Sequence, residues 1–93
     1  MITKKQALEN VVKYLKEHKR EYLYINTVDQ ISFEEKKFIN YGKYENQEKD
    51  IFIVNYYIEG YLEPIAHFVA VDAETGEILF TATPHGYAED WEE

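Results

Sequence analysis

Cysteine is absent from the sequence, serine occurs once, and no lysine or arginine follows Lys49. Without cysteine neither a disulfide nor a thiolate metal site can form, which fits a reducing compartment. No apolar run approaches the roughly 20 residues that a membrane-spanning helix needs. The chain begins with polar helical sequence and not with the apolar segment of a signal peptide. We therefore expect a soluble, cytoplasmic protein with no membrane partner.

The missing cations leave the second half of the chain strongly acidic. Residues 1–49 hold ten basic and eight acidic side chains, whereas residues 50–93 hold ten acidic and no basic ones. Such a half-chain attracts basic partners and repels nucleic acid, whose phosphates need lysine and arginine contacts. We expect no nucleic-acid binding through this half and, on one interpretation, a basic partner protein. On the other interpretation the charge only provides solubility.

The chain length predicts one domain. Ninety-three residues, 45% of them hydrophobic, are enough for one core but leave little room for a second. We expect a single α+β domain over residues 1–93. Residues 84–93 form its acidic C-terminal tail, which is too acidic and too broken in pattern to predict a strand.

The start of the chain predicts a helix over about residues 4–18. Thr3 followed three residues later by Gln6 is a capping box, in which the two side chains satisfy backbone donors at a helix start. The apolar residues that follow at helical spacing are Leu8, Val11, Val12 and Leu15. This stripe is typical of a helix that covers a sheet.

Three apolar stretches, residues 51–58, 65–71 and 78–83, predict strands. Short connections join them, so neighbouring strands should run antiparallel. Asp72 and Gly76 indicate a tight turn before the last strand. An aspartate can bond the backbone two residues on, and glycine takes a positive φ without steric cost.

The stretch between the helix and these strands is harder to interpret. We expect one strand within residues 28–45, carrying residues 38–44. Residues 22–28 form either a further strand or an irregular connection, and residues 32–35 match a second capping box that would open a short helix.

Both faces of the predicted sheet are apolar or aromatic. Along residues 51–58 the alternation of a strand places Ile51, Ile53 and Tyr57 on one face and Phe52, Val54, Tyr56 and Ile58 on the other. One helix covers one face, and a face open to water should be polar. We therefore expect residues 21–48 and the tail, or a second molecule, to cover the other face.

No pattern indicates catalysis, a metal or a cofactor. His18, His67 and His85 show no ligand spacing with one another, and Ser32 has no nucleophile-elbow context. Residues 72–77 lack the fifth-position ligand and the distal glutamate of a calcium loop. We expect a protein that is not an enzyme.

Two stretches resemble a known family. Residues 2–8 resemble the helix start of PepSY domains, and residues 69–79 resemble their closing hairpin with its Asp-Ala-x-Thr-Gly turn. The resemblance implies a PepSY- or cystatin-like fold and a regulatory or peptidase-inhibiting role outside the cytoplasm. The same hairpin resembles that of small bacterial toxin-immunity proteins, which implies a cytoplasmic inhibitor. No functional residue carries over, because the matched positions look structural.

We therefore predict an N-terminal helix packed on a three- to four-stranded antiparallel sheet. The predicted function is a non-catalytic protein-binding or inhibitory module, of immunity type, for a basic partner. The alternatives are a PepSY-like regulator and a small-ligand-binding homodimer, the latter indicated by a pocket lined by His67 or His85. The predicted contact residues combine aromatic rings with charge: Tyr56, Tyr57, Glu59, Tyr61, Glu63, His85, Tyr87, Asp90 and Trp91.

Overall fold

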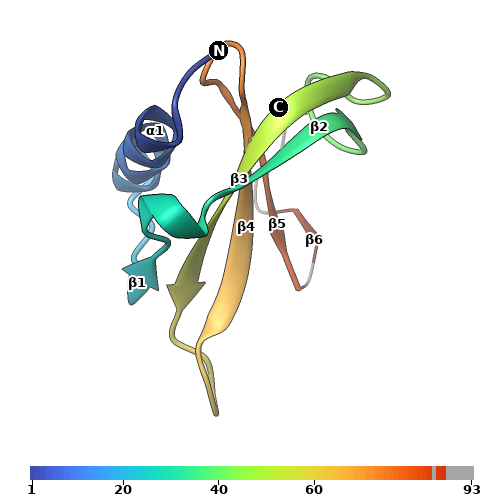
Figure 1. Ribbon diagram of the computed structural model, residues 1–93. Helices are drawn as coiled ribbons and strands as arrows, with labels where there is room; N and C mark the ends of the chain where they lie inside the picture. The colour runs from blue at the N-terminus through green and yellow to red at the C-terminus, as the bar shows by residue number, and fades with distance from the viewer. Residues whose placement is uncertain (85, 88–93) are drawn as a thin grey trace.

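A computed structural model describes residues 1–84, 86 and 87 (Figure 1). One helix, α1 (Lys4–Glu17), lies on one face of an antiparallel sheet. The strands are β1 (Tyr24–Ile25), β2 (Ser32–Phe38), β3 (Glu48–Ile58), β4 (Ile65–Asp72), β5 (Ile78–Thr83) and β6 (Gly86–Tyr87), and a 3-10 turn, η1 (Val28–Gln30), precedes β2. This arrangement confirms the predicted α+β fold class. None of the helices in the described part of the chain is long and apolar enough to cross a membrane.

The long strand β3 is the centre of the sheet. The strand order is β1-β3-β4-β5-β6, and β2 also pairs with β3. β1 lies against residues 56–57 of β3, and β2 lies against residues 48–53, so the two short strands share one edge. The three strands predicted at residues 51–58, 65–71 and 78–83 are confirmed, with β3 beginning earlier at Glu48.

The helix begins and ends with defined backbone bonds. Thr3 Oγ1 accepts the Gln6 N–H at 3.1 Å, and Gln6 Oε1 accepts the Thr3 N–H at 2.9 Å, which confirms the capping box. After the helix, Lys19 takes a positive φ of 55°. Its N–H bonds Lys16 O at 3.1 Å, and the Arg20 N–H bonds Leu15 O at 2.9 Å. This pair of bonds is a Schellman motif, which turns the chain back toward the sheet.

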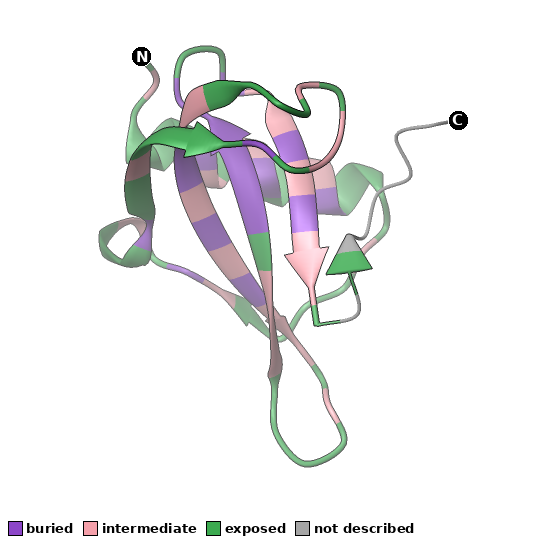
Figure 2. Ribbon diagram, turned by 90° about the vertical axis from the view of Figure 1, so that its right-hand side faces the viewer, coloured by how far each residue is buried: buried purple, intermediate pink, exposed green. Residues whose placement is uncertain are grey.

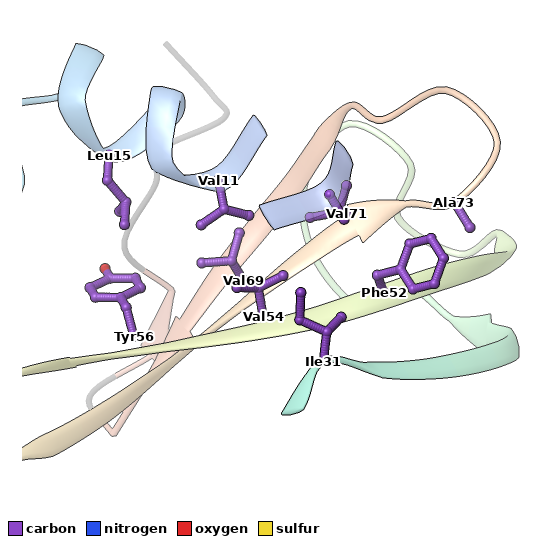
Figure 3. Packing of buried hydrophobic residues seen from close by; sticks show 10 residues of the cluster. Val11, Leu15, Ile31, Phe52, Val54, Tyr56, Val69, Val71 and Ala73 are labelled. Atoms are coloured by element: carbon purple, nitrogen blue, oxygen red, sulfur yellow. The ribbon is translucent and has the colours of Figure 1, made fainter. Parts of the chain in front are cut away.

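The main core lies between α1 and the sheet. Val11 and Leu15 of α1 point toward Val69 and Tyr56 of the sheet (Figure 3). The buried members of this cluster are Ala7, Val11, Leu15, Ile31, Phe52, Val54, Tyr56, Val69, Val71 and Ala73. Burying each large apolar side chain stabilises the fold by about 1.5–3 kcal/mol, so this face determines where the helix sits.

The opposite face of the sheet is covered in part. Ile39, Ile51, Ala70 and Leu79 form a second buried cluster there. Residues 39–47 turn over one end of this face, closed by bonds of 2.8 Å from Ile39 N–H to Gln47 O and from Asn46 N–H to Ile39 O. Toward the other end Phe68 is 44% exposed. The second face is apolar, as predicted, and the described residues leave part of it open.

Two expectations for the stretch between α1 and β3 are wrong. The strand expected at residues 38–44 lies at Ser32–Phe38. It contains a bulge between Glu34 and Lys37, where Lys36 has a φ of 51° and donates its N–H to Asp50 Oδ1 at 2.9 Å. The possible helix at residues 32–35 does not form. Phe33 instead packs its ring on Phe52, with centroids 5.4 Å apart.

Two short strands were not expected as such. Of residues 22–28, the segment left open between strand and connection, only Tyr24–Ile25 join the sheet. The tail was expected to hold no strand, yet Gly86–Tyr87 form β6 beside β5. Gly86 has a φ of 119°, and its carbonyl oxygen accepts the Thr83 hydroxyl at 2.8 Å, which turns the chain back.

Candidate functional site

The β3–β4 hairpin ends in an exposed loop of residues 59–64 that extends past the rest of the sheet (Figure 2). At its tip Tyr61 is 100% exposed and Leu62 is 91% exposed. Glu59 and Glu63 flank these two residues and are exposed as well. Large apolar side chains at such exposure contribute nothing to the core of this chain, and two of them side by side make the tip a candidate contact surface.

A glycine defines how the loop folds back. A Cβ at Gly60 would lie 2.2 Å from Glu63 O and 2.8 Å from Ile65 Cγ1. A side chain at this position would therefore push the two arms of the loop apart. Because the arms close this tightly, Tyr61 and Leu62 are held at the outside of the turn.

The start of β1 and the residue before it add apolar surface at the base of the same hairpin. The Leu23 N–H bonds Tyr57 O at 2.7 Å, and the Tyr24 ring stacks on the Tyr57 ring with centroids 4.6 Å apart. Leu23 and Tyr24 are each about half exposed. We name the whole region the hairpin-end surface, which consists of Leu23, Tyr24, Tyr57, Glu59, Tyr61, Leu62 and Glu63.

Some acidic residues of the protein have ion-pair partners, whereas those of the hairpin-end surface have none among the described residues. Lys49 Nζ lies 3.0 Å from Asp72 Oδ2. Lys43 Nζ lies 3.7 Å from Glu77 Oε2, and the Tyr44 hydroxyl donates to Glu77 Oε1 at 2.8 Å. In the described part of the chain no ion pair involves Glu59 or Glu63. Lysines of the first half thus neutralise the β4–β5 end, and the hairpin-end surface keeps its negative charge.

The structure brings four predicted contact residues together and separates the others. Tyr57, Glu59, Tyr61 and Glu63 all belong to the hairpin-end surface. Tyr56 does not, because it is 2% exposed and faces α1. Adjacent residues of a strand point to opposite faces, so Tyr56 and Tyr57 cannot serve one surface.

Three predicted residues, His85, Asp90 and Trp91, lie outside the described residues. For Tyr87 the structure describes the backbone, which pairs with Ala82 in β5. The sequence prediction omits Leu62, which lies between the predicted residues Tyr61 and Glu63. The reason is that the prediction considers only aromatic and charged side chains. The prediction also missed Leu23 and Tyr24, whose nearness to the hairpin depends on the pairing of β1 with β3.

A shallow pocket of about 250 Å³ lies on the helix side of the sheet, lined by Arg20, Glu21, Tyr56, Ile58 and His67. The His67 Nδ1 lies 3.0 Å from the Tyr56 hydroxyl oxygen. Burial, and secondly the Arg20 guanidinium, lower the pKa of His67 below its ordinary value of 6.5. This histidine is therefore mainly neutral at pH 7.

A groove of about 370 Å³ lies on the opposite face, lined by Ile53, Asn55, Phe68, Phe80 and Ala82 among others. The Oδ1 atom of Asn55 is buried and has no hydrogen-bond partner in the described part of the chain. Over residues 1–84, 86 and 87, no three His, Asp or Glu side chains lie close enough together to hold a metal ion.

Comparison with known proteins shows no family for this chain. The chain matches no family model, no curated protein and no solved structure. The resemblance to PepSY domains therefore stays a prediction, and the function has to be argued from the residues themselves.

Proposed function

We propose that this protein is a non-catalytic binding module that attaches to a basic partner protein through the hairpin-end surface. The observation that carries the proposal is the exposure of Tyr61 and Leu62 at the tip of a hairpin that extends past the sheet. Glu59 and Glu63 flank these two residues, and neither has an ion-pair partner among the described residues.

The chemistry of this surface suits a protein interface. Interface centres are enriched in aromatic side chains, and charged residues form their rims. Burying the side chains of a tyrosine and a leucine on binding supplies apolar contact, and a few such anchors carry most of the binding energy of an interface. The negative charge of Glu59 and Glu63 would accelerate encounter with a cationic partner and select against acidic ones.

The form of this function that we propose is inhibition, as in a cytoplasmic immunity protein. A projecting loop can enter a cleft that a flat surface cannot reach, and an acidic one complements a cleft lined with cations. A PepSY-like regulatory role would use the same surface, and the identity of the partner would distinguish the two roles.

The test is quantitative capture from lysate of the source cell with three immobilised proteins. They are the wild type, the Y61A/L62A variant and an F38A control, which removes an exposed aromatic side chain at the opposite end of β3. We expect a basic protein to be retained by the wild type and F38A, and about tenfold less by Y61A/L62A, which loses two apolar anchors.

Salt and charge variants complete the test. Retention of the partner should fall as the salt concentration of the wash rises. The fall should be less steep for E59Q/E63Q than for E45Q/E48Q, a control with the same change of charge. Equal retention of every partner by wild type and Y61A/L62A, with both proteins folded, would show that the hairpin end does not bind.

A further inference from the structure

The strand β2 is an edge strand with an open outer side. Among the described strands it pairs with β3 alone, so its other side presents backbone donors and acceptors to solvent (Figure 1). Every residue of β2 except Glu34 is exposed, and Phe33 and Phe38 expose 40% and 48% of their surface. An open edge that carries aromatic side chains can pair with a further strand.

The order of charges along β2 is complementary to itself. Two glutamates are followed by two lysines, and a phenylalanine flanks the four on either side: Phe33, Glu34, Glu35, Lys36, Lys37 and Phe38. When two copies of this stretch run antiparallel, with their centre between residues 35 and 36, each glutamate lies opposite a lysine. Each phenylalanine then lies opposite a phenylalanine. Opposite charges and aromatic pairs across neighbouring strands are stabilising, whereas like charges directly opposite one another are not.

The bulge in β2 makes this register geometrically possible. Directly opposed residues of antiparallel strands lie on one face of the sheet, whereas residues five positions apart in a regular strand lie on opposite faces. The bulge adds one residue to β2. As a result Phe33 lies opposite Phe52 of β3, and Phe38 lies opposite Glu48, four positions from Phe52. Both phenylalanines therefore face the helix side of the sheet, as the self-complementary register requires.

The charged residues on the other face obey the same geometry. Glu34 lies opposite Ile51 and Lys37 opposite Lys49, so both side chains face away from α1. Lys37 Nζ lies 3.9 Å from Glu34 Oε1 within the chain. Charges and a bulge normally protect an edge strand from foreign strands. Here the same charges select one register, because a shift by two residues in either direction places glutamate opposite glutamate or lysine opposite lysine.

We propose that two copies of this protein associate through their β2 strands, antiparallel and about a two-fold axis at the bulge. Phe33 lies opposite Phe38 of the second copy on the helix side, and Glu34 lies opposite Lys37 of the second copy on the other face. The same strand is used in both copies, so association stops at the dimer. The contact runs along residues 48–53 of β3 and leaves the hairpin-end surface open. It does not depend on the function proposed for that surface.

The test is a charge-swap experiment on the full chain, read by NMR translational diffusion over a dilution series. The series starts at about 1 mM, because a contact of one strand pair belongs to the weak class of interfaces. The wild type should form a dimer, and the amide signals of residues 32–38 should shift on dilution. E34K/E35K and K36E/K37E should each dimerise at least about tenfold more weakly, because like charges then oppose one another.

Mixing the two charge variants is the decisive arm. With E34K/E35K isotopically labelled and K36E/K37E unlabelled, the labelled protein should diffuse as a dimer, because every charge again lies opposite its counter-charge. The fourfold swap E34K/E35K/K36E/K37E stays self-complementary and should dimerise like the wild type. E9K/E17K has the same change of net charge as E34K/E35K, but on exposed positions of α1, and should not weaken the dimer.

Circular dichroism shows that each protein in the series is folded. A wild type that stays monomeric at every concentration would overturn the proposal. So would an equal weakening by E34K/E35K and E9K/E17K, or a mixture of the two folded charge variants that remains monomeric.

Discussion

The two hairpin turns of this sheet have opposite roles. The β4–β5 turn, residues 73–77, is bonded to the rest of the protein. Its Ala73 O accepts the Ile2 N–H at 2.8 Å, and its Gly76 O accepts Asn10 Nδ2 at 3.0 Å. The β3–β4 turn, residues 59–64, makes no hydrogen bond to another element in the described part of the chain, and its largest side chains are exposed. We infer that the β4–β5 turn, which is hydrogen-bonded to the rest of the protein, stabilises the fold. The β3–β4 turn lacks such bonds and is available for binding.

The two turns also differ in the burial and bonding of their carboxylates. Asp72 starts the β4–β5 turn with a buried side chain that accepts the Glu74 N–H at 2.8 Å and pairs with Lys49. Glu59 and Glu63 at the other turn are exposed to water. The same residue class therefore stabilises one turn and leaves the other free to attract a partner.

The largest expected effect on stability is that of Asp72→Ala. The substitution leaves the Lys49 ammonium without its partner and the N–H of Glu74 without its acceptor, so we expect a loss of about 3 kcal/mol in the free energy of unfolding. Urea denaturation followed by circular dichroism measures it. A loss below about 0.5 kcal/mol, the range of ordinary surface substitutions, would contradict the role given to this turn.

Gly76→Ala should have the next largest effect. Gly76 has a φ of 82°, and a Cβ there would lie 2.7 Å from Asn10 Nδ2. We expect a loss of about 2 kcal/mol from backbone strain and the displaced side chain. Gly60→Ala is the matched variant in the other turn. Its NMR shift changes should stay close to the turn, because a Cβ there meets only Glu63 and Ile65, whereas those of Gly76→Ala should extend into α1 through Asn10.

The dependence of stability on acid pH should reveal the contribution of Asp72. Burial raises the pKa of Asp72, but the bonds from Lys49 and from the N–H groups of Glu74 and Thr75 outweigh it, so the pKa lies below 3.8. A pKa lowered by folding contributes stability that is present above the unfolded-state pKa and is lost as the pH falls through the folded-state value. The wild type should therefore lose stability below pH 3.8 more steeply than Asp72→Asn. Parallel curves for the two proteins would contradict this.

The smallest effect on stability is expected for E59Q/E63Q. Neither carboxylate has an ion-pair partner in the described part of the chain, so the urea midpoint should not move measurably. A clear fall in the midpoint would mean that these residues support the fold, and the contrast between the two turns would fail.

The sequence predicts those features that depend on local bonds. The capping box at Thr3 and Gln6 and the turn at Asp72 and Gly76 are correct, because each acts within a few residues of the chain. The displaced β2 could not be predicted in the same way. Its bulge at Lys36 is fixed by Asp50, fourteen residues away, which no local pattern reveals.

The candidate site was predictable to the extent that it lies within one loop. Tyr57, Glu59, Tyr61 and Glu63 were selected from one continuous stretch, and the structure brings them together. Arg20 and His67 lie 47 positions apart in the sequence, and only the Schellman turn and the β3–β4 register bring them to one pocket. Sites made by tertiary packing require the structure.

Photo-crosslinking in the source cell tests most directly that the hairpin end is the binding surface. A photoreactive phenylalanine replaces Tyr61 in one protein and Lys13, an exposed residue of α1, in the other. We predict that position 61 yields a discrete crosslinked band containing a basic protein, that position 13 does not, and that added E59Q/E63Q weakens the band. Crosslinking to the same partner from position 13 but not from position 61 would contradict the account.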